Sequence, residues 1–533
     1  MKRLTMIIFA ILLAASGINA QDRDEEKTPE IRSRIKPQVF KPYRQLEIKS
    51  IGKISPKSIR KTGRPTIQDE KEGEMLTPDQ IRKLKIKEAA KIRFEEDRKM
   101  KMRSSTAPAG DTKEDADPAA DDATKPQFDV NAAGGNPPDN TVAISSTGFI
   151  VAADNDQIGF YREDGSEIDK FDYPDFLDGL DSSVGSNTSD PKLIYDPEEN
   201  QFIFFVQSGG SSSSSLCVLA FSTTDDPTDP WNVFSFNTFS GDNLWFDYPG
   251  LAVNYREVYL TGNLFNDSDE FSGNVIYAID KDDGYANRGL TMDEYRNVER
   301  EWFTPAASIF AVPASRSTMY GPGMYFVSTV SGGAGDVYLF HITKHIGDDP
   351  ELRKYKIDIP DYDPPASAAQ KGTSTRLDIG DCRVKGAYYQ HGKVYFVFTK
   401  DDGHAFGGIS YNRIRISDLY HKAKFFHDNQ NSDYSYPNIV NRLSNETYSR
   451  AVLVFLRSGT DVFPQMRKRF LRGTMTASGR STRIRAGASF RGTSSCSTCR
   501  WGDYIGLQRK YGTKSAWTTG HTPGTDNRWR SHL

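Results

Sequence analysis

The chain of 533 residues is 37% hydrophobic and 12% aromatic, with 43 glycines and 27 prolines, which suffices for one large all-β domain or two domains of ordinary size. Its formal net charge of −3 excludes a protein that binds polyanions with its whole surface. The charge is uneven, because residues 465–533 hold fourteen Lys and Arg against two Asp. This basic region either balances the acidic middle of the same fold or meets an acidic glycan or lipid head group, and nucleic acid is not an expected partner.

The first twenty residues have the pattern of a secretory signal peptide. Lys2 and Arg3 precede an apolar run at 4–15, and the small residues near Ala20 suit cleavage before Gln21. No other stretch approaches the roughly 20 apolar residues of a membrane helix, so we expect no transmembrane segment. The pattern predicts export to the periplasm, the outer surface or the extracellular space.

Residues 21–126 form a charged extension that is poor in aromatic residues. Such a composition predicts a largely disordered segment, because it offers little apolar surface to bury. One helix is expected within it at about 77–103, where Thr77 can cap the first turn and Pro78 suits the first helical position. Its apolar residues do not share one face, which favours a solvated helix, although docking of the extension to a partner stays open.

From about residue 127 to 533 the sequence changes to short apolar runs separated by Gly, Asn and Asp. Strands of this length without long helical periods predict a sandwich, a barrel or a propeller. A polar or aromatic residue that opens an apolar strand recurs at intervals of about 50 to 75 residues, which is room for four short strands. These recurring positions are Asp139, Asp190, Asp247, Ser308, Asp381, Tyr436 and Asp503. We therefore predict an all-β propeller with six or seven blades, seven being preferred, in which a strand near Phe128 completes the last blade and closes the ring.

The stretches "DPKLIYDPEENQFIFF", "WFDYPGLAVNYREVYLTGN" and "CRWGDYIG" stand in the order and spacing of a group of exported bacterial β-propeller proteins. The chain resembles this group over roughly residues 130–533. The group is loosely related to sialidase-like and BNR-repeat propellers and mostly lacks assigned activity. The resemblance implies a propeller fold and an extracytoplasmic setting, and it supplies no catalytic residues. The Asp-box hairpin of true sialidases is absent from every predicted blade.

Residues that open innermost strands converge at one mouth of a propeller's channel, although they lie far apart in sequence. The candidate binding residues at this mouth are Asp139, Asp190, Asp247, Asp381, Arg383, Tyr436 and Asp503. Several carboxylates there could coordinate calcium (Ca²⁺) or form an acid/base pair. They could equally cap turns by accepting backbone N–H bonds, as Asp residues often do. The candidate metal ligands are Asp139, Asp190, Asp247 and Asp503.

A sialidase-type mechanism would need three arginines that clamp a carboxylate and a tyrosine nucleophile. Arg383, Arg500 and Arg376 lie near predicted strand starts, and Tyr436 and Tyr504 are placed comparably. Their local spacing does not tie them together.

The four cysteines of this chain are Cys217, Cys382, Cys496 and Cys499. All four are disulfide candidates in an exported protein, and three connectivities are open. The Cys-x-x-Cys pair lacks the further ligands of a zinc site and the fold context of a thioredoxin motif. We expect Cys496 and Cys499 to form a disulfide that constrains a loop.

These patterns predict an exported propeller that acts as a binding or scaffold module for a cell-surface glycan or an envelope protein. The alternative is a glycoside hydrolase or lyase, sialidase-like, with its site at the channel mouth. Whether the protein is an enzyme stays open, and a non-enzymatic role is favoured. The pattern identifies no cofactor with certainty, and calcium is the one metal that it admits. In a third alternative, residues 21–126 hold the protein in a larger envelope complex.

Overall fold

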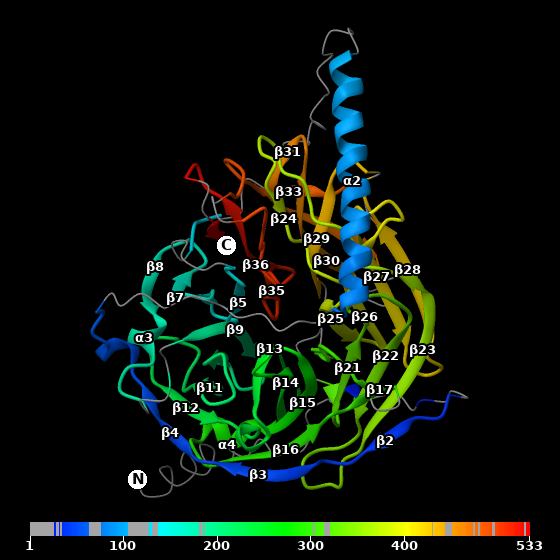
Figure 1. Ribbon diagram of the computed structural model, residues 1–533. Coiled ribbons are helices and arrows are strands. Elements are labelled where there is room, and N and C mark those ends of the chain that lie inside the picture. Colours follow the sequence, from blue (N-terminus) through cyan, green and yellow to red (C-terminus); the bar gives the residue numbers. More distant parts are fainter. Residues whose placement is uncertain are drawn as a thin grey trace, which may run out of the picture.

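The computed structural model shows a mostly β propeller of seven blades arranged in a ring (Figure 1). It describes residues 26–27, 31, 35–62, 76–104, 127–130, 137–180, 184, 187–301, 304–313, 320–428, 430–442, 450–472, 475–477, 480–492, 496–526 and 529–533. The expected signal peptide at 1–20 lies outside the described residues. The preference for seven blades is confirmed.

Each blade is an antiparallel sheet whose first strand lines the channel and whose later strands lie further out. Blade 1 consists of β5 (Thr141–Ile144), β6 (Phe149–Ala153), β7 (Gln157–Arg162) and β8 (Glu167–Asp172). Blade 2 consists of β9 (Thr188–Asp196), β10 (Gln201–Ser208), β11 (Leu216–Ser222) and β12 (Trp231–Phe236). Blade 3 consists of β13 (Leu244–Val253), β14 (Glu257–Asn266), β15 (Phe271–Asp280) and β16 (Leu290–Arg296).

The remaining blades follow the same plan. Blade 4 consists of β19 (Phe310–Ala311), β21 (Met324–Ser328), β22 (Ala334–Ile342) and β23 (Leu352–Tyr362). Blade 5 consists of β25 (Val384–Gln390), β26 (Lys393–Asp401), β27 (Gly407–Arg415) and β28 (Tyr420–Phe426). Blade 6 consists of β29 (Asp433–Asn441), β30 (Arg450–Gly459), β31 (Val462–Arg472), β32 (Thr476–Ala477) and β33 (Thr482–Ala486). Blade 7 consists of β35 (Gly506–Arg509), β36 (Ala516–Pro523) and β37 (Trp529–His532).

Short elements connect the blades. Three pairs of short strands are β1 (Glu26–Lys27) with β20 (Tyr320–Gly321), β17 (Glu299–Glu301) with β18 (Thr304–Pro305), and β24 (Arg376–Leu377) with β34 (Thr498–Cys499). The helical turns are α3 (Tyr173–Phe176), α4 (Lys281–Tyr285), η1 (Pro56–Ser58) and η2 (Ser240–Asp242).

The ring closes through residues 127–130, as the sequence predicts. The backbone N–H of Phe128 donates to the carbonyl of Leu533 at 3.2 Å, and that of Leu533 donates back to Phe128 at 3.0 Å. Asp129 pairs with His532 in the same antiparallel ladder. An N-terminal segment thus becomes the outer strand of the last blade and covers the edge that β37 would otherwise expose.

Residues 38–54 correct the expectation of a largely disordered extension. They form β2 (Gln38–Phe40), β3 (Arg44–Ile48) and β4 (Ser50–Ile54), the fifth, outermost strands of blades 4, 3 and 2. In Figure 1 they run along the outside of the ring like a belt. The segment orders because the blade edges supply backbone hydrogen bonds and apolar side chains such as Leu46 and Ile48 pack against the core.

The expected helix is confirmed as α2 (Pro78–Ser104), which lies against blades 5 and 6 and projects beyond the ring (Figure 1). Thr77 caps it as predicted: Gln80 N–H donates to the Thr77 hydroxyl, and Thr77 N–H donates to the Gln80 side chain. The helix is not merely solvated, because Lys91 and Glu95 are buried against the propeller. Within the described residues, no helix has the length and apolar character needed to cross a membrane.

The cysteines are only partly paired. Cys496 and Cys499 form the expected disulfide, but Cys217 and Cys382 are free and buried, so they are not disulfide partners. Cys217 lies in β11 and Cys382 lies before β25, in blades that are not neighbours, and burial raises the pKa of both thiols.

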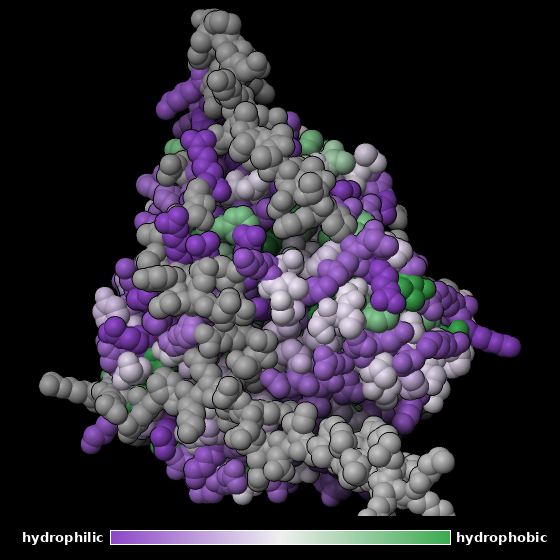
Figure 2. Space-filling model, turned by 180° about the vertical axis from the view of Figure 1, so that it is seen from behind, coloured by the Kyte–Doolittle hydropathy of each residue, from purple (hydrophilic) through white to green (hydrophobic). Residues whose placement is uncertain are grey.

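The surface carries few large apolar side chains. On the face opposite to the view of Figure 1, the described residues are mainly hydrophilic, with small scattered hydrophobic spots (Figure 2). The most exposed large apolar residues are spread over the extension and the outer strands: Ile35, Val39, Tyr43, Ile86, Phe94, Met100, Ile168 and Tyr420. The hydrophobic interior lies between the blades.

Candidate functional site at the channel mouth

A backbone kink marks the start of the innermost strand in every blade. Each blade has one residue with positive φ there, and these residues are Asp139, Asp190, Tyr248, Ser308, Gly380, Tyr436 and Gly502. The seven positions singled out in the sequence are either these residues or their direct neighbours. Asp and Gly tolerate the left-handed conformation better than most residues. The recurring pattern in the sequence therefore reflects a recurring backbone turn.

The turn brings four of the predicted carboxylates together, although they come from blades 1, 2, 3 and 7. The backbone N–H of Asp503 donates to Asp139 Oδ1. Asp190 Oδ1 accepts a hydrogen bond from the Tyr504 hydroxyl at 2.8 Å, and its Oδ2 accepts one from Tyr248 N–H at 3.2 Å. Asp247 accepts one from the side chain of Gln207 at 3.2 Å.

These carboxyl groups titrate unusually because they are buried beside one another. Burial, with Asp503 and Asp190 nearby, raises the pKa of Asp139 to about 7. Burial and the charge of Asp190 raise the pKa of Asp247 well above its ordinary value. Burial also raises the pKa of Asp190. Two carboxylates in contact favour sharing one proton, so part of this cluster is neutral near pH 7.

Asp503 behaves in the opposite way because cations surround it. Arg500 Nη2 lies 2.9 Å from Asp503 Oδ2, and Arg383 Nη2 lies 3.8 Å from Oδ1. Arg500 and Arg383 lower the pKa of Asp503 against the effect of its burial. Arg383 also pairs with Asp381 at 2.8 Å. All of these groups therefore belong to one charged network.

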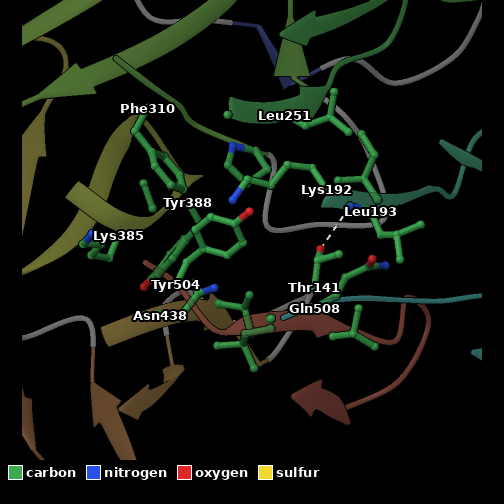
Figure 3. Close-up of a pocket in the computed structure, with 18 of the residues that line it drawn as sticks. Thr141, Lys192, Leu193, Leu251, Phe310, Lys385, Tyr388, Asn438, Tyr504 and Gln508 are labelled. Carbon is green, nitrogen blue, oxygen red and sulfur yellow. Dashed lines mark hydrogen bonds between the residues drawn. The ribbon is translucent and has the colours of Figure 1, made fainter. Parts of the chain in front are cut away.

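A cavity of about 160 Å³ continues from this network into the channel, and all seven innermost strands line it. Figure 3 shows Lys192, Lys385, Tyr388 and Tyr504 around it, with Leu193, Leu251 and Phe310 on its apolar walls. Among the described residues that line it, none is an Asp or a Glu. The carboxylates thus lie behind the wall, and the wall itself presents lysine amines and tyrosines.

The two lysines differ in their surroundings. Lys385 is buried and donates to the Tyr248 hydroxyl at 2.8 Å. Lys192 Nζ lies over the Tyr504 ring, 2.7 Å from its centroid. Within the described part of the chain, this amine has no hydrogen-bond acceptor and no carboxylate within 4 Å. Burial lowers the pKa of Lys192 to about 7, although Asp190 and Asp139 oppose that effect.

The structure brings all seven predicted mouth residues into this network. The hydroxyl of Tyr436 lies 3.4 Å from the Asp378 carbonyl oxygen, and its ring lies 5.3 Å from Lys385 Nζ. Arg376 does not belong to the mouth, because its guanidinium binds Glu95 of α2 at 2.8 Å. The predicted trio of arginines is therefore wrong in one member.

No metal cluster is found among the residues that the structure describes. None of their groups of three or more His, Cys, Asp or Glu is arranged to hold an ion. The oxygens of the four candidate ligands accept from backbone N–H groups and from the side chains of a tyrosine, an asparagine, a glutamine and an arginine. This accords with the turn-capping alternative, and the calcium hypothesis gains no ligand set here.

Lys192, Lys385 and Tyr248 were not singled out from the sequence. Lys192 stands two residues after the strand-opening Asp190, but the register of β9 shifts between them, so simple alternation along the strand does not place its side chain. Lys385 lies on β25, the first strand of its blade, four residues after Asp381, which precedes that strand. A lysine in such a strand is unusual, because lysines are seldom buried.

Comparisons with known proteins assign no family to the chain. No protein-family profile matches the chain, and no curated protein matches it. The structure is distantly similar to a mutant Trypanosoma rangeli sialidase with trans-sialidase activity: 10% identity, 76% of this chain, 58% of that chain, TM-score 0.37. It is similar to the extracellular domains of Drosophila Semaphorin 1b (8%, 76% and 86%, TM-score 0.37). It is also similar to the Synechocystis apocarotenoid oxygenase (13%, 69% and 78%, TM-score 0.34). Likeness at this level tells nothing about function.

Proposed function

We propose that the protein is an exported binding module whose central channel holds an acidic group of a surface glycan. The observation that carries this proposal is the Lys192 amine, which faces the cavity and has no acceptor among the described residues. An amine in such a place favours an anionic partner, because its charged form is costly when it is removed from water without an acceptor. The export of the protein follows from its first twenty residues.

The walls of the cavity also suit a sugar ligand. Strands from all seven blades surround it, so little ordering is needed when a ligand enters. The Tyr504 and Tyr388 side chains line the cavity and give it aromatic surface against which a sugar can pack beside the Lys192 amine. Lys385 is held by Tyr248 and supplies a second positive charge in a fixed position.

Binding is favoured over hydrolysis by the placement of the carboxylates. A glycosidase needs two carboxyl groups that reach the scissile bond from both sides. Here the part of the cavity wall that the structure describes has no Asp or Glu, and the nearby carboxylates already accept hydrogen bonds. The glycoside hydrolase alternative would require these groups to leave their partners.

A binding assay tests the proposal. Oligosaccharides that contain a uronate and their neutral counterparts are titrated into the wild type, Lys192→Met and Lys99→Met. Lys99 is an exposed residue of α2 and provides the matched loss of one lysine. We expect only the acidic sugars to bind, and Lys192→Met to weaken binding about 10- to 100-fold, as a charge-assisted hydrogen bond of about 1.5–3 kcal/mol implies.

Several outcomes would overturn the proposal. If neutral and acidic sugars bound equally well, or if Lys192→Met and Lys99→Met had the same affinity, Lys192 would not be the group that recognises the ligand. Binding of an acidic peptide in place of any glycan would make the ligand a protein partner. Cleavage of a sugar that is lost in an Asp190→Asn variant would favour the hydrolase.

A further inference from the structure

A second cationic site lies at the opposite end of blade 6. The strand β29 begins at the channel mouth and ends at Asn441, so Arg442 stands at the other end of the channel. There Arg442, Arg450 and Arg472 line a cavity of about 170 Å³, together with Ala451, Phe470 and Leu471. No carboxylate is among the described residues that line it.

The strand register places these arginines side by side. Arg450 on β30 is the direct partner of Arg472 on β31. The backbone N–H of Arg442 donates to the Arg450 carbonyl at 2.7 Å. Arg442, Arg450 and Arg472 thus follow one another across three neighbouring strand ends, and we call them the arginine row. Like charges directly opposite each other destabilise an antiparallel pair. The cross-strand pair brings two arginines to one edge of the blade, where both line the cavity.

The guanidinium of Arg442 is held in place. It lies 4.6 Å from the centroid of the Phe470 ring, and Nε donates to the Lys514 carbonyl at 3.2 Å. Phe470 and Arg472 are two residues apart on β31, so their side chains share a face of the sheet. One arginine is thus fixed by a ring and a carbonyl beside the cross-strand pair.

We propose that this arginine row is a binding site for a phosphate or sulfate ester. Guanidinium groups present planar forks of N–H donors that match tetrahedral oxyanions, and three of them suit a group with more than one negative charge. The site goes beyond the proposed function, since it lies at the other end of the channel and shares no residue with the lysine-lined cavity. One of its three arginines, Arg472, belongs to the basic region at 465–533.

Calorimetric titration with inorganic phosphate and sulfate tests the site, with chloride adjusted to keep the ionic strength constant. The variants are Arg472→Gln, Arg472→Lys and Arg415→Gln, the last being an exposed arginine of blade 5 that pairs with Asp418. We expect saturable binding in the wild type and in Arg415→Gln. Binding should fall at least tenfold in Arg472→Gln and by less in Arg472→Lys, which keeps the charge without the fork.

Glucose 6-phosphate, glucose 6-sulfate and vesicles of phosphatidylglycerol then distinguish a soluble ester from a lipid head group. Loss of binding in Arg472→Gln with any of these probes supports the site. The proposal is wrong if phosphate and sulfate bind no more strongly than chloride, or if Arg415→Gln loses as much binding as Arg472→Gln. Uronate binding in the channel should be unchanged in Arg472→Gln, which shows that the variant is folded and keeps the two sites distinct.

Discussion

Replacing Lys91 by Met should release helix α2 from the propeller. The Lys91 amine lies 2.6 Å from Asp433 Oδ1, and the two side chains are 0% and 1% exposed. It also donates to the carbonyl groups of Ala366 and Ser367 at 3.2 and 2.9 Å. Met fills a similar volume but leaves the Asp433 carboxylate buried without its cation.

Breaking one side of a buried pair costs about 3–5 kcal/mol. If this penalty appears as local opening of the helix, amide protection in α2 should fall roughly a hundredfold to a few thousandfold. Hydrogen exchange measured by mass spectrometry on the segment 84–95 reports this directly. Lys99→Met, on the exposed side of the same helix, is the control and should leave protection unchanged.

The effect should also depend on pH. Burial raises the pKa of Asp433 to about 6 even though Lys91 opposes it. The protonated carboxyl needs no cation, so the loss in Lys91→Met should be small at pH 5 and should grow as the pH rises through 6 towards 8. Equal protection in Lys91→Met and Lys99→Met at pH 8 would refute the view that this ion pair docks the helix.

Three further outcomes are expected. Because the folded-state pKa of Asp139 is raised to about 7, its contribution to stability is complete below about pH 4 and is lost as the pH rises through 7. The melting temperature of the wild type should therefore be higher at pH 5 than at pH 8.5 by more than that of Asp139→Asn. An equal difference in the two proteins would contradict the raised pKa of Asp139. Thiol labelling without reductant should modify no cysteine in the native protein and two, Cys217 and Cys382, after unfolding; four labelled thiols would mean that the disulfide is absent. Deleting residues 21–130 should expose blade edges and produce oligomers by size-exclusion chromatography, whereas a stable monomer would show that ring closure needs no N-terminal strand.

The propeller could be predicted because each blade repeats a short local sequence pattern. The strand-opening positions coincide with a backbone turn of positive φ, and turn-forming residues are readable without knowledge of the fold. Asp247 and Asp503 were found in this way even though their neighbours, Tyr248 and Gly502, carry the positive φ. The closing strand at Phe128 followed from the need to cover a sheet edge.

The belt of outer strands could not be seen in the composition of the extension. Averaged over a hundred residues, its charge indicates disorder, but Leu46 and Ile48 alternate with polar residues over one short stretch. That stretch becomes a strand only because the edge of blade 3 is already present to pair with it. The order is imposed by tertiary contacts, which local propensity does not contain.

The carboxylates of the site could be predicted from the sequence, but the cavity lined by Lys192 and Lys385 could not. Each Asp has a local signal, whereas the position of Lys192 over Tyr504 depends on how blades 2 and 7 meet across the closed ring. Arg376 shows the reverse error: its place in the sequence suggested the mouth, but Glu95 of the distant helix binds it instead. Contacts between segments hundreds of residues apart decided both cases.

A crystal structure of the protein soaked with a uronate oligosaccharide would test the central claim most directly. The proposal predicts the carboxylate of the sugar in the channel cavity, about 2.7–3.2 Å from Lys192 Nζ, with a sugar ring against Tyr504. A sugar whose glycosidic oxygen instead lies between two carboxyl groups such as Asp190 and Asp247, or one bound outside the channel, would contradict it.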